Sequence, residues 1–280
     1  MKTIDQIFSR MVVKNTLVCC GLDPDLSKIP LEISKQKISD EEKVFMFLCT
    51  VIDLTAPHVC LYKAQKAFFD ILPRGHEVLK KVIEYVHKNY QGIPVVLDCK
   101  IGDTRNTMSI YIKNIFDILD ADGVVANPYM GDDTMIPLAE LSEKAIIVLV
   151  KTSNPKGSVI QDIILEKSLP LWRYVLDLVI NRWNYNNNMI PVLSSNCECN
   201  MAGIRMLVPE NMLILLAGVG AQNGSYSNLD LLLNKNKNGV FVNSSRGILY
   251  SSIQKPWRVA IEDAVIELKN NLNKAGGRYE

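Results

Sequence analysis

The sequence predicts an α/β protein that folds as a closed (β/α)8 TIM barrel. Two observations carry this prediction: short apolar runs recur along the 280 residues, and a helical pattern follows most of them. The length is suitable as well, because such barrels commonly have about 250 residues. We expect residues 1–280 to form one barrel domain with a loose C-terminal tail from about residue 273. A doubly wound open sheet is the structural alternative.

Eight apolar runs are expected to form the strands. They lie at residues 17–23, 59–63, 95–100, 123–127, 146–152, 190–194, 213–218 and 240–243. Most of them lack the alternation of polar and apolar residues that a half-exposed strand shows. They therefore resemble parallel strands that are buried on both faces.

Helix patterns lie between these runs. Residues 41–56 place Val44, Phe47, Leu48 and Val51 on one face, and Pro57 ends the helix. Further helices are expected at residues 76–90, 106–119, 132–143, 162–183, 198–207, 225–233 and 256–272. Strands that alternate with helices in this way favour a parallel sheet closed into a barrel.

The composition excludes several classes of protein. Lysine and arginine number 31 against 30 acidic residues, and this balance predicts neither a nucleic-acid nor a membrane partner. The seven cysteines are odd in number and several lie in apolar runs, as expected for reduced thiols in the cytoplasm. Cys197 and Cys199 are spaced too closely for an ordinary zinc site. We expect no signal peptide and no membrane span.

Charged residues gather where the first three strands are predicted to end. Asp23 follows the first strand, Lys63 ends the second, and the third runs into Asp98-x-Lys100-x-x-Asp103. In a barrel these three ends are neighbours, and chemistry takes place at the carboxyl ends of the strands. A structural salt-bridge network is the alternative interpretation. A lysine flanked by carboxylates stays protonated, which makes it a good proton donor.

A second candidate site follows the last two strands. Residues 218–224 are rich in glycine, and residues 243–247 read Asn-Ser-Ser-Arg-Gly. Loops at these positions of a barrel often bind phosphate, and Gln222 and Arg246 would add side-chain donors. Two tight turns with a surface arginine are the alternative. Lys151-Thr-Ser-Asn-Pro155, after the fifth strand, could read a polar heterocycle or cap a helix, and alone it decides nothing.

These phrases together resemble the orotidine 5′-phosphate decarboxylase family, in particular its second sequence group. The resemblance is carried by Gly-Leu-Asp-Pro at 21–24, Lys-Ala-Gln-Lys-Ala-Phe-Phe-Asp at 63–70, Leu-Asp-Cys-Lys-Ile-Gly-Asp at 97–103, Lys-Thr-Ser-Asn-Pro at 151–155, Gly-Val-Gly-Ala-Gln at 218–222 and Asn-Ser-Ser-Arg at 243–246. It is in register over roughly residues 15–255. Arg105 and the Ser194–Cys197 phrase depart from the family pattern.

The resemblance implies decarboxylation of orotidine 5′-monophosphate to uridine 5′-monophosphate in pyrimidine synthesis, with no cofactor and no metal. Lys100 would deliver a proton to C6 of the pyrimidine. Asp98 would lie against the departing carboxylate and hold Lys100, and Lys63 would orient Asp98. Asp103 would complete the catalytic set.

The resemblance also implies how the substrate is held. Asp23 would bind a ribose hydroxyl and Ser153 the pyrimidine, while Gln222 and Arg246 hold the phosphate. Ser245 is a further substrate-binding residue. Asp103 and Thr107 would come from the neighbouring subunit of a homodimer.

Two alternative functions remain from the residues themselves. A hexulose-phosphate synthase shares the Asp-x-Lys-x-x-Asp pattern but uses magnesium, and all three histidines lie before the end of the third strand, which argues against it. A phosphate-binding barrel without catalysis would not need the five charges. A fused second enzyme is not expected in a chain of this length.

Overall fold

Eight parallel strands close into a barrel, in which each strand pairs with the next along the chain and β8 pairs with β1. The strands are β1 Val18–Gly21, β2 Leu61–Gln65, β3 Val95–Ile101, β4 Gly123–Ala126, β5 Ala145–Leu149, β6 Met189–Ser194, β7 Ile214–Ala217 and β8 Val240–Ser244. The computed structural model describes residues 1–166, 168–195, 201–218, 226, 228–251 and 256–278. The predicted barrel is confirmed, and each of the eight predicted runs overlaps a strand.

The strands are buried almost throughout, as their apolar sequences predict. Their register places the carboxyl ends of the first three strands side by side. Gly21 of β1 is level with Lys63 of β2, and Gln65 of β2 is level with Asp98 of β3. The charged residues that follow these strands therefore meet at one edge of the barrel.

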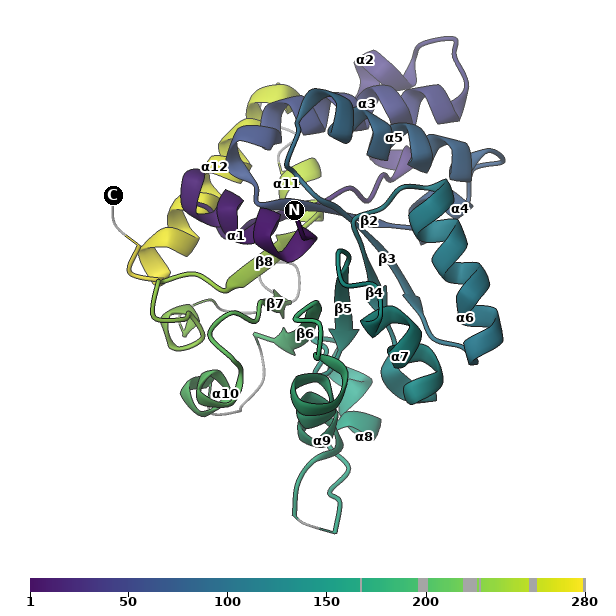
Figure 1. The fold of residues 1–280 in the computed structure, drawn as a ribbon. Helices are drawn as coiled ribbons and strands as arrows, with labels where there is room; N and C mark the ends of the chain where they lie inside the picture. The colour runs from purple at the N-terminus through teal and green to yellow at the C-terminus, as the bar shows by residue number, and fades with distance from the viewer. Residues whose placement is uncertain (167, 196–200, 219–225, 227, 252–255, 279–280) are drawn as a thin grey trace.

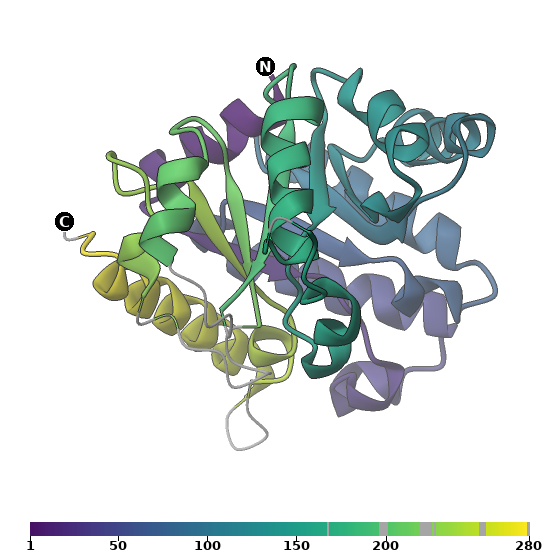
Figure 2. The ribbon, with the colours of Figure 1, turned by 90° about the horizontal axis from the view of Figure 1, so that it is seen from below.

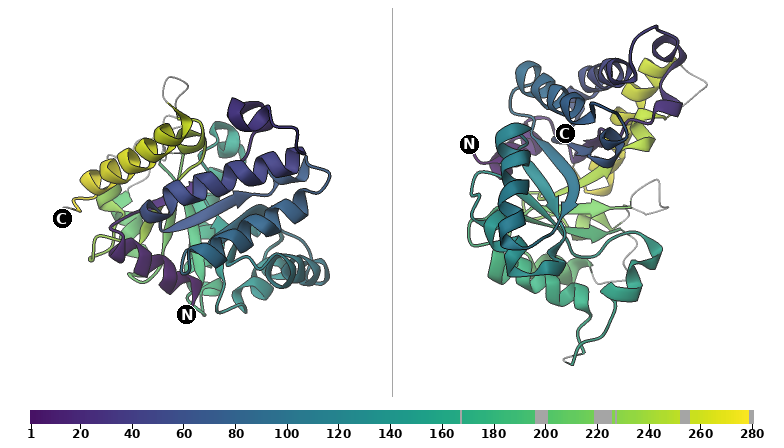
Figure 3. Two further views of the ribbon diagram at one scale, coloured as in Figure 1. Left: turned by 90° about the horizontal axis from the view of Figure 1, so that it is seen from above. Right: turned by 90° about the vertical axis from the view of Figure 1, so that its right-hand side faces the viewer.

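Helices surround the barrel (Figure 1). They are α1 Thr3–Val13, α2 Leu31–Ser34, α3 Asp40–Thr55, α4 Ala67–Asp70, α5 Gly75–Asn89, α6 Arg105–Ile112, α7 Asp132–Ala139, α8 Ser158–Gln161, α9 Leu171–Leu178, α10 Met201–Leu207, α11 Arg246–Leu249 and α12 Trp257–Ala275. Figure 2 shows α12, in yellow, along the outside of the barrel, and Figure 3 shows α12, α3 and α5 side by side. Single turns of 3₁₀ helix lie at Leu26–Lys28, Ala56–His58, Pro128–Met130, Pro155–Gly157 and Leu229–Leu231, and π-helical turns at Lys113–Ile118 and Val179–Trp183.

The helix predicted at 41–56 is confirmed as α3. A capping box starts it: the Ser39 side chain accepts from the backbone of Glu42, whose carboxylate accepts from the backbone of Ser39. The predicted apolar stripe, including Val44 and Phe47, is buried against the barrel. The helix at 76–90 is likewise confirmed as α5.

Two predicted helices are wrong in extent. The helix expected at 162–183 begins only at Leu171, because Pro170 favours an extended residue before it and is itself extended. Ile164 and Pro170 instead form an isolated antiparallel bridge. Of the helix expected at 225–233, the described residues form one 3₁₀ turn at Leu229–Leu231.

The expected loose tail is also wrong for residues 273–278, which are packed against the N-terminal helix. The Asn273 amide donates to the Asn15 carbonyl at 2.8 Å, and the Arg278 guanidinium donates to the Met11 carbonyl at 2.9 Å. Helix α1, which supplies this surface, was not predicted, although Ile4, Ile7 and Met11 have helical spacing and are buried.

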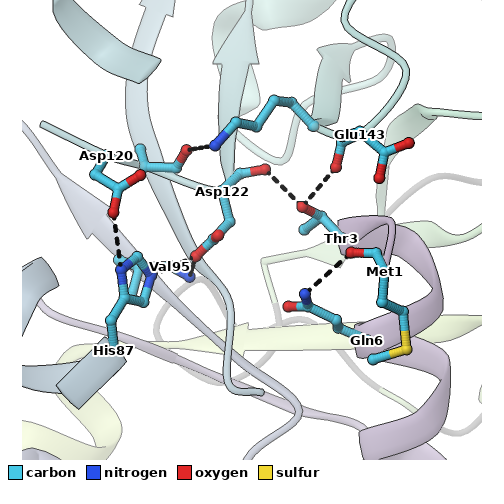
Figure 4. A network of polar contacts seen from close by, with 10 residues as sticks. Met1, Thr3, Gln6, His87, Val95, Asp120, Asp122 and Glu143 are labelled. Atoms are coloured by element: carbon cyan, nitrogen blue, oxygen red, sulfur yellow. Dashed lines mark hydrogen bonds and ion pairs between the residues drawn. The ribbon is translucent and has the colours of Figure 1, made fainter. Parts of the chain in front are cut away.

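A polar cluster joins α5 to the amino ends of β3 and β4 (Figure 4). Nε2 of His87 lies 2.8 Å from the Asp122 carboxylate, which also accepts from the Val95 backbone at 2.8 Å. Nδ1 of His87 lies 3.5 Å from the Asp120 carboxylate. The hydrogen bond to Asp122 and the two negative charges outweigh burial and raise the pKa of His87.

This raised pKa predicts a pH-dependent contribution to stability. Because the folded state binds the proton more tightly, the contribution is complete below the unfolded pKa of about 6.5 and is lost as pH rises through the folded pKa. The free energy of unfolding lost in a His87→Gln variant should therefore be larger at pH 6 than at pH 9 in urea titrations. His76→Gln, at an exposed position of the same helix, is the control. An equal loss at both pH values in His87→Gln would contradict the prediction.

Candidate active site

A cavity of about 360 Å³ opens at the carboxyl ends of the strands, a size typical of small-molecule sites. Most of the predicted site residues line it: Asp23, Lys63, Asp98, Lys100, Ser153, Ser245 and Arg246. They lie in β2 and β3 or just after β1, β5 and β8, so residues distant in sequence meet because the barrel closes. The charged set and the predicted phosphate site thus share one cavity.

The Asp98 carboxylate bridges two lysines. One oxygen lies 2.7 Å from Nζ of Lys63, and the other lies 2.6 Å from Nζ of Lys100. Asp98 and Lys63 are buried, whereas the Lys100 side chain is 46% exposed toward the cavity. Lys100 is therefore the member of this trio that is most accessible to a bound molecule.

The electrostatics keep both buried groups, Asp98 and Lys63, charged. Burial on its own would raise the pKa of Asp98, but the two ammonium groups hold it below its usual range. Burial would lower the pKa of Lys63, but the carboxylates of Asp98 and Asp23 raise it. A buried carboxylate between two cations is stable only as an ionised set, because removing one partner leaves an uncompensated charge.

The backbone of Lys100 departs from a regular strand. Its φ is +47°, in the left-handed region that non-glycine residues rarely adopt, and the pairing of β3 with β4 is irregular between Asp98 and Ile101. Irregularities of this kind redirect a side chain and cluster at functional sites. Here the distortion accompanies the close contact between Asp98 and Lys100.

Two glycines allow the loops around the cavity to approach closely. A Cβ atom on Gly21 would lie 1.8 Å from Oγ of Ser245. The end of β1 can therefore approach the β8 loop this closely only because residue 21 has no side chain. Gly218 has a φ of +90°, and a Cβ there would lie 2.6 Å from Cβ of Ser153. The approach of Gly218 to Ser153 places the loops that follow β5 and β7 side by side at the cavity.

Asp103 and Thr107 do not line the cavity of their own chain. The Asp103 carboxylate accepts from the Thr104 backbone at 2.8 Å, and no ion pair joins it to Lys100 in the described part of the chain. Thr107 is exposed on α6. Gln222, which we expected to bind phosphate, lies outside the described residues.

The structure adds residues to the predicted site. The polar ones are Thr152, Asn154, Asn243 and Ser244, and the apolar ones are Val125, Ile147, Leu149, Val192 and Leu215. These four polar residues lie in the sequence motifs described above, next to predicted site residues. The only sequence signal for the apolar residues is that residues two apart on a strand face the same side, as Ile147 and Leu149 do.

No group of three or more His, Cys, Asp or Glu side chains among the described residues is placed to hold a metal ion. None of the helices that these residues form is long and apolar enough to cross a membrane.

A closed parallel barrel with an ionised cluster at the carboxyl ends of its strands defines the class of (β/α)8 barrel enzymes. The chain belongs to the orotidine 5′-phosphate decarboxylase / HUMPS family, whose sequence profile matches residues 16–256. It is 33% identical over 275 residues to the orotidine 5′-phosphate decarboxylase of Cupriavidus metallidurans, covering 98% of both chains. That of Cellvibrio japonicus is 34% identical over 98% of this chain and 99% of its own.

Solved structures agree with this assignment. The OMP decarboxylase of Leishmania donovani superposes with a TM-score of 0.83 at 29% identity, covering 99% of this chain and 100% of its own. A structure of UMP synthase from the same organism gives a TM-score of 0.84 at 30% identity over 98% of this chain and 56% of that one. The resemblance seen in the sequence is therefore confirmed over nearly the whole chain.

The bridging contacts predict unequal effects on stability. Asp98→Ala leaves the buried Lys63 ammonium without its closest partner and should lower the free energy of unfolding by about 3 kcal/mol. Lys100→Ala removes a half-exposed partner while the Lys63–Asp98 pair remains, so it should cost less than about 1 kcal/mol. Urea titrations at pH 7 measure both values. Equal losses would mean that Asp98 is not the residue on which this cluster depends.

Proposed function

We propose that this protein catalyses the decarboxylation of orotidine 5′-monophosphate to uridine 5′-monophosphate in de novo pyrimidine synthesis, in the cytoplasm. The observation that carries the proposal is the Lys63–Asp98–Lys100 cluster in the cavity of a chain that belongs to this family. The named relatives, which match over nearly their full length, support it.

The reaction needs a group that protonates carbon. When the C6–carboxylate bond breaks, its electron pair stays on C6 and carbon dioxide leaves. Lys100, charged and accessible from the cavity, stabilises that pair and delivers the proton to C6. Asp98 lies against the departing carboxylate and holds Lys100, while Lys63 fixes Asp98 from its buried side. The chemistry is complete with these side chains and uses no cofactor.

The rest of the cavity suits a nucleotide. The apolar residues, such as Ile147 and Leu215, offer a surface for the pyrimidine, and Ser153 faces its polar edge. Asp23 binds a ribose hydroxyl. Arg246, with Ser245 and Gln222, binds the phosphate, and this distant binding energy is available to assist the chemical step.

The working unit that we propose is a homodimer, in which Asp103 and Thr107 act in the partner's site. The support is that Asp103 has no ion pair with Lys100 in the described part of its own chain, and that Thr107 is exposed. Thr107 lies in the first turn of α6, four residues beyond Asp103, so both side chains belong to the same end of this segment.

Turnover in the presence of a chelator tests the proposed reaction. Purified protein with orotidine 5′-monophosphate and excess EDTA should show the absorbance loss that accompanies decarboxylation, at the rate measured without EDTA. Hexulose phosphate with and without magnesium is the comparison. Activity only on the sugar phosphate, and only with magnesium, would overturn the decarboxylase proposal in favour of the sister reaction.

Subunit complementation tests the shared site. Asp103→Ala and Lys100→Ala subunits are each expected to be inactive alone. If Asp103 acts in the partner's site, a mixed dimer contains one site with both residues intact and one with neither, so about half of its sites should work. Each variant exchanged with itself is the control, and differently tagged subunits prove that exchange occurred. No recovery after proven exchange would refute the shared site and leave the decarboxylase proposal standing.

A further inference from the structure

The loop at residues 152–154 lines the cavity but lies beyond the strand that leads to it. Lys151 makes the last backbone bond to the neighbouring strand, at 3.0 Å from the Val192 carbonyl. After this point Thr152 is held by α8. The Thr152 backbone donates to Oε1 of Gln161 at 3.1 Å, and Nε2 of Gln161 donates to the Thr152 hydroxyl at 2.7 Å. One carboxamide thus binds Thr152 twice.

The side-chain hydrogen bonds run in one direction, from Gln161 through Thr152 to Asn154. A hydroxyl has a single proton, and the Thr152 hydroxyl donates it to Oδ1 of Asn154. It can do so because Gln161 supplies the donor on its other side. A side chain at 161 must therefore accept from a backbone N–H and donate to a hydroxyl at once, which an uncharged amide does and a carboxylate cannot.

Two further contacts hold this loop against α8. Lys151, with a side chain only 12% exposed, pairs with Asp162, which directly follows the helix. Gly157 lies so close that a Cβ there would be 3.0 Å from the Thr152 hydroxyl and 3.2 Å from Nε2 of Gln161. The helix is short and lies outside the barrel ladder, so these side-chain contacts define where the loop lies.

We propose that Gln161 is a positioning residue for the decarboxylation: its amide holds Thr152 and Asn154 so that Ser153, between them, faces the pyrimidine. The inference rests on the proposed function and adds a residue that does not itself line the cavity. Ser153 is fixed on its other side by its close approach to Gly218. A site that hydrogen-bonds polar groups of its substrate depends on the exact position of its own polar groups. A displacement of the loop that carries Ser153 should therefore lower kcat/KM.

Gln161→Glu separates this role from general packing. The ionised carboxylate keeps the size of the side chain but cannot donate to Thr152, and its protonated form restores one donor and one acceptor. At pH 8 the kcat/KM of the variant should be about tenfold lower than that of the wild type, because the variant lacks one hydrogen bond. The ratio of the two kcat/KM values should return toward one as pH falls to 5. The charged groups around the position, Lys151, Asp162 and Lys156, are the same in both proteins, and Gln161→Met shows how the loss behaves without a titratable group at 161.

Three further variants complete the test. Gln161→Met, which has neither donor nor acceptor, should show a similar loss that does not change with pH, and it replaces Gln161→Glu if that variant fails to fold. Val159→Ala, at an exposed position of the same helix, and Gln36→Glu, at a distant position, should behave as wild type. Thermal unfolding confirms that each variant is folded.

A double-mutant cycle identifies the route of the effect. If Gln161 acts through Ser153, then Gln161→Glu in a Ser153→Ala background should reduce kcat/KM by less than about twofold. A full additional loss in that background, a ratio that is constant with pH, or wild-type activity in Gln161→Glu would each overturn the inference. A wild-type protein that does not decarboxylate orotidine 5′-monophosphate would overturn the proposed function instead.

Discussion

The functional end of this protein depends on one carboxylate that contacts two ammonium groups. Asp98 lies 2.7 Å from Lys63 and 2.6 Å from Lys100. Neither Asp98 nor Lys63 could remain charged in this buried position alone, since desolvation opposes the charged form of each. Together they form an ionised pair whose carboxylate also holds the more accessible Lys100 ammonium beside the cavity.

The barrel supplies what this cluster requires. Parallel pairing in register brings the ends of β1, β2 and β3 to one edge, and closure through β8 brings Arg246 to the same cavity. Gly21 permits the close approach of β1 to the β8 loop. The opposite end of the barrel carries a separate polar cluster around His87, away from the proposed chemistry.

Sequence reasoning succeeded where a short-range pattern decides the structure. Apolar runs buried on both faces located the eight strands, and charges following those runs located the cavity. It failed where distant contacts decide: the tail is ordered by hydrogen bonds from Asn273 and Arg278 to residues near the N-terminus. The left-handed backbone of Lys100 and the bonds of Gln161 to Thr152 depend on the folded surroundings, and no local signal indicates them.

The catalytic role that we propose for Lys100 is to act in the transition state while the rest of the cavity binds the nucleotide. It is tested most directly by measuring, for Lys100→Ala, both kcat for orotidine 5′-monophosphate and Kd for uridine 5′-monophosphate. A group that acts as proton donor should leave Kd within about tenfold and lower kcat by at least about a thousandfold. Retention of a sizeable fraction of the wild-type kcat would contradict the claim.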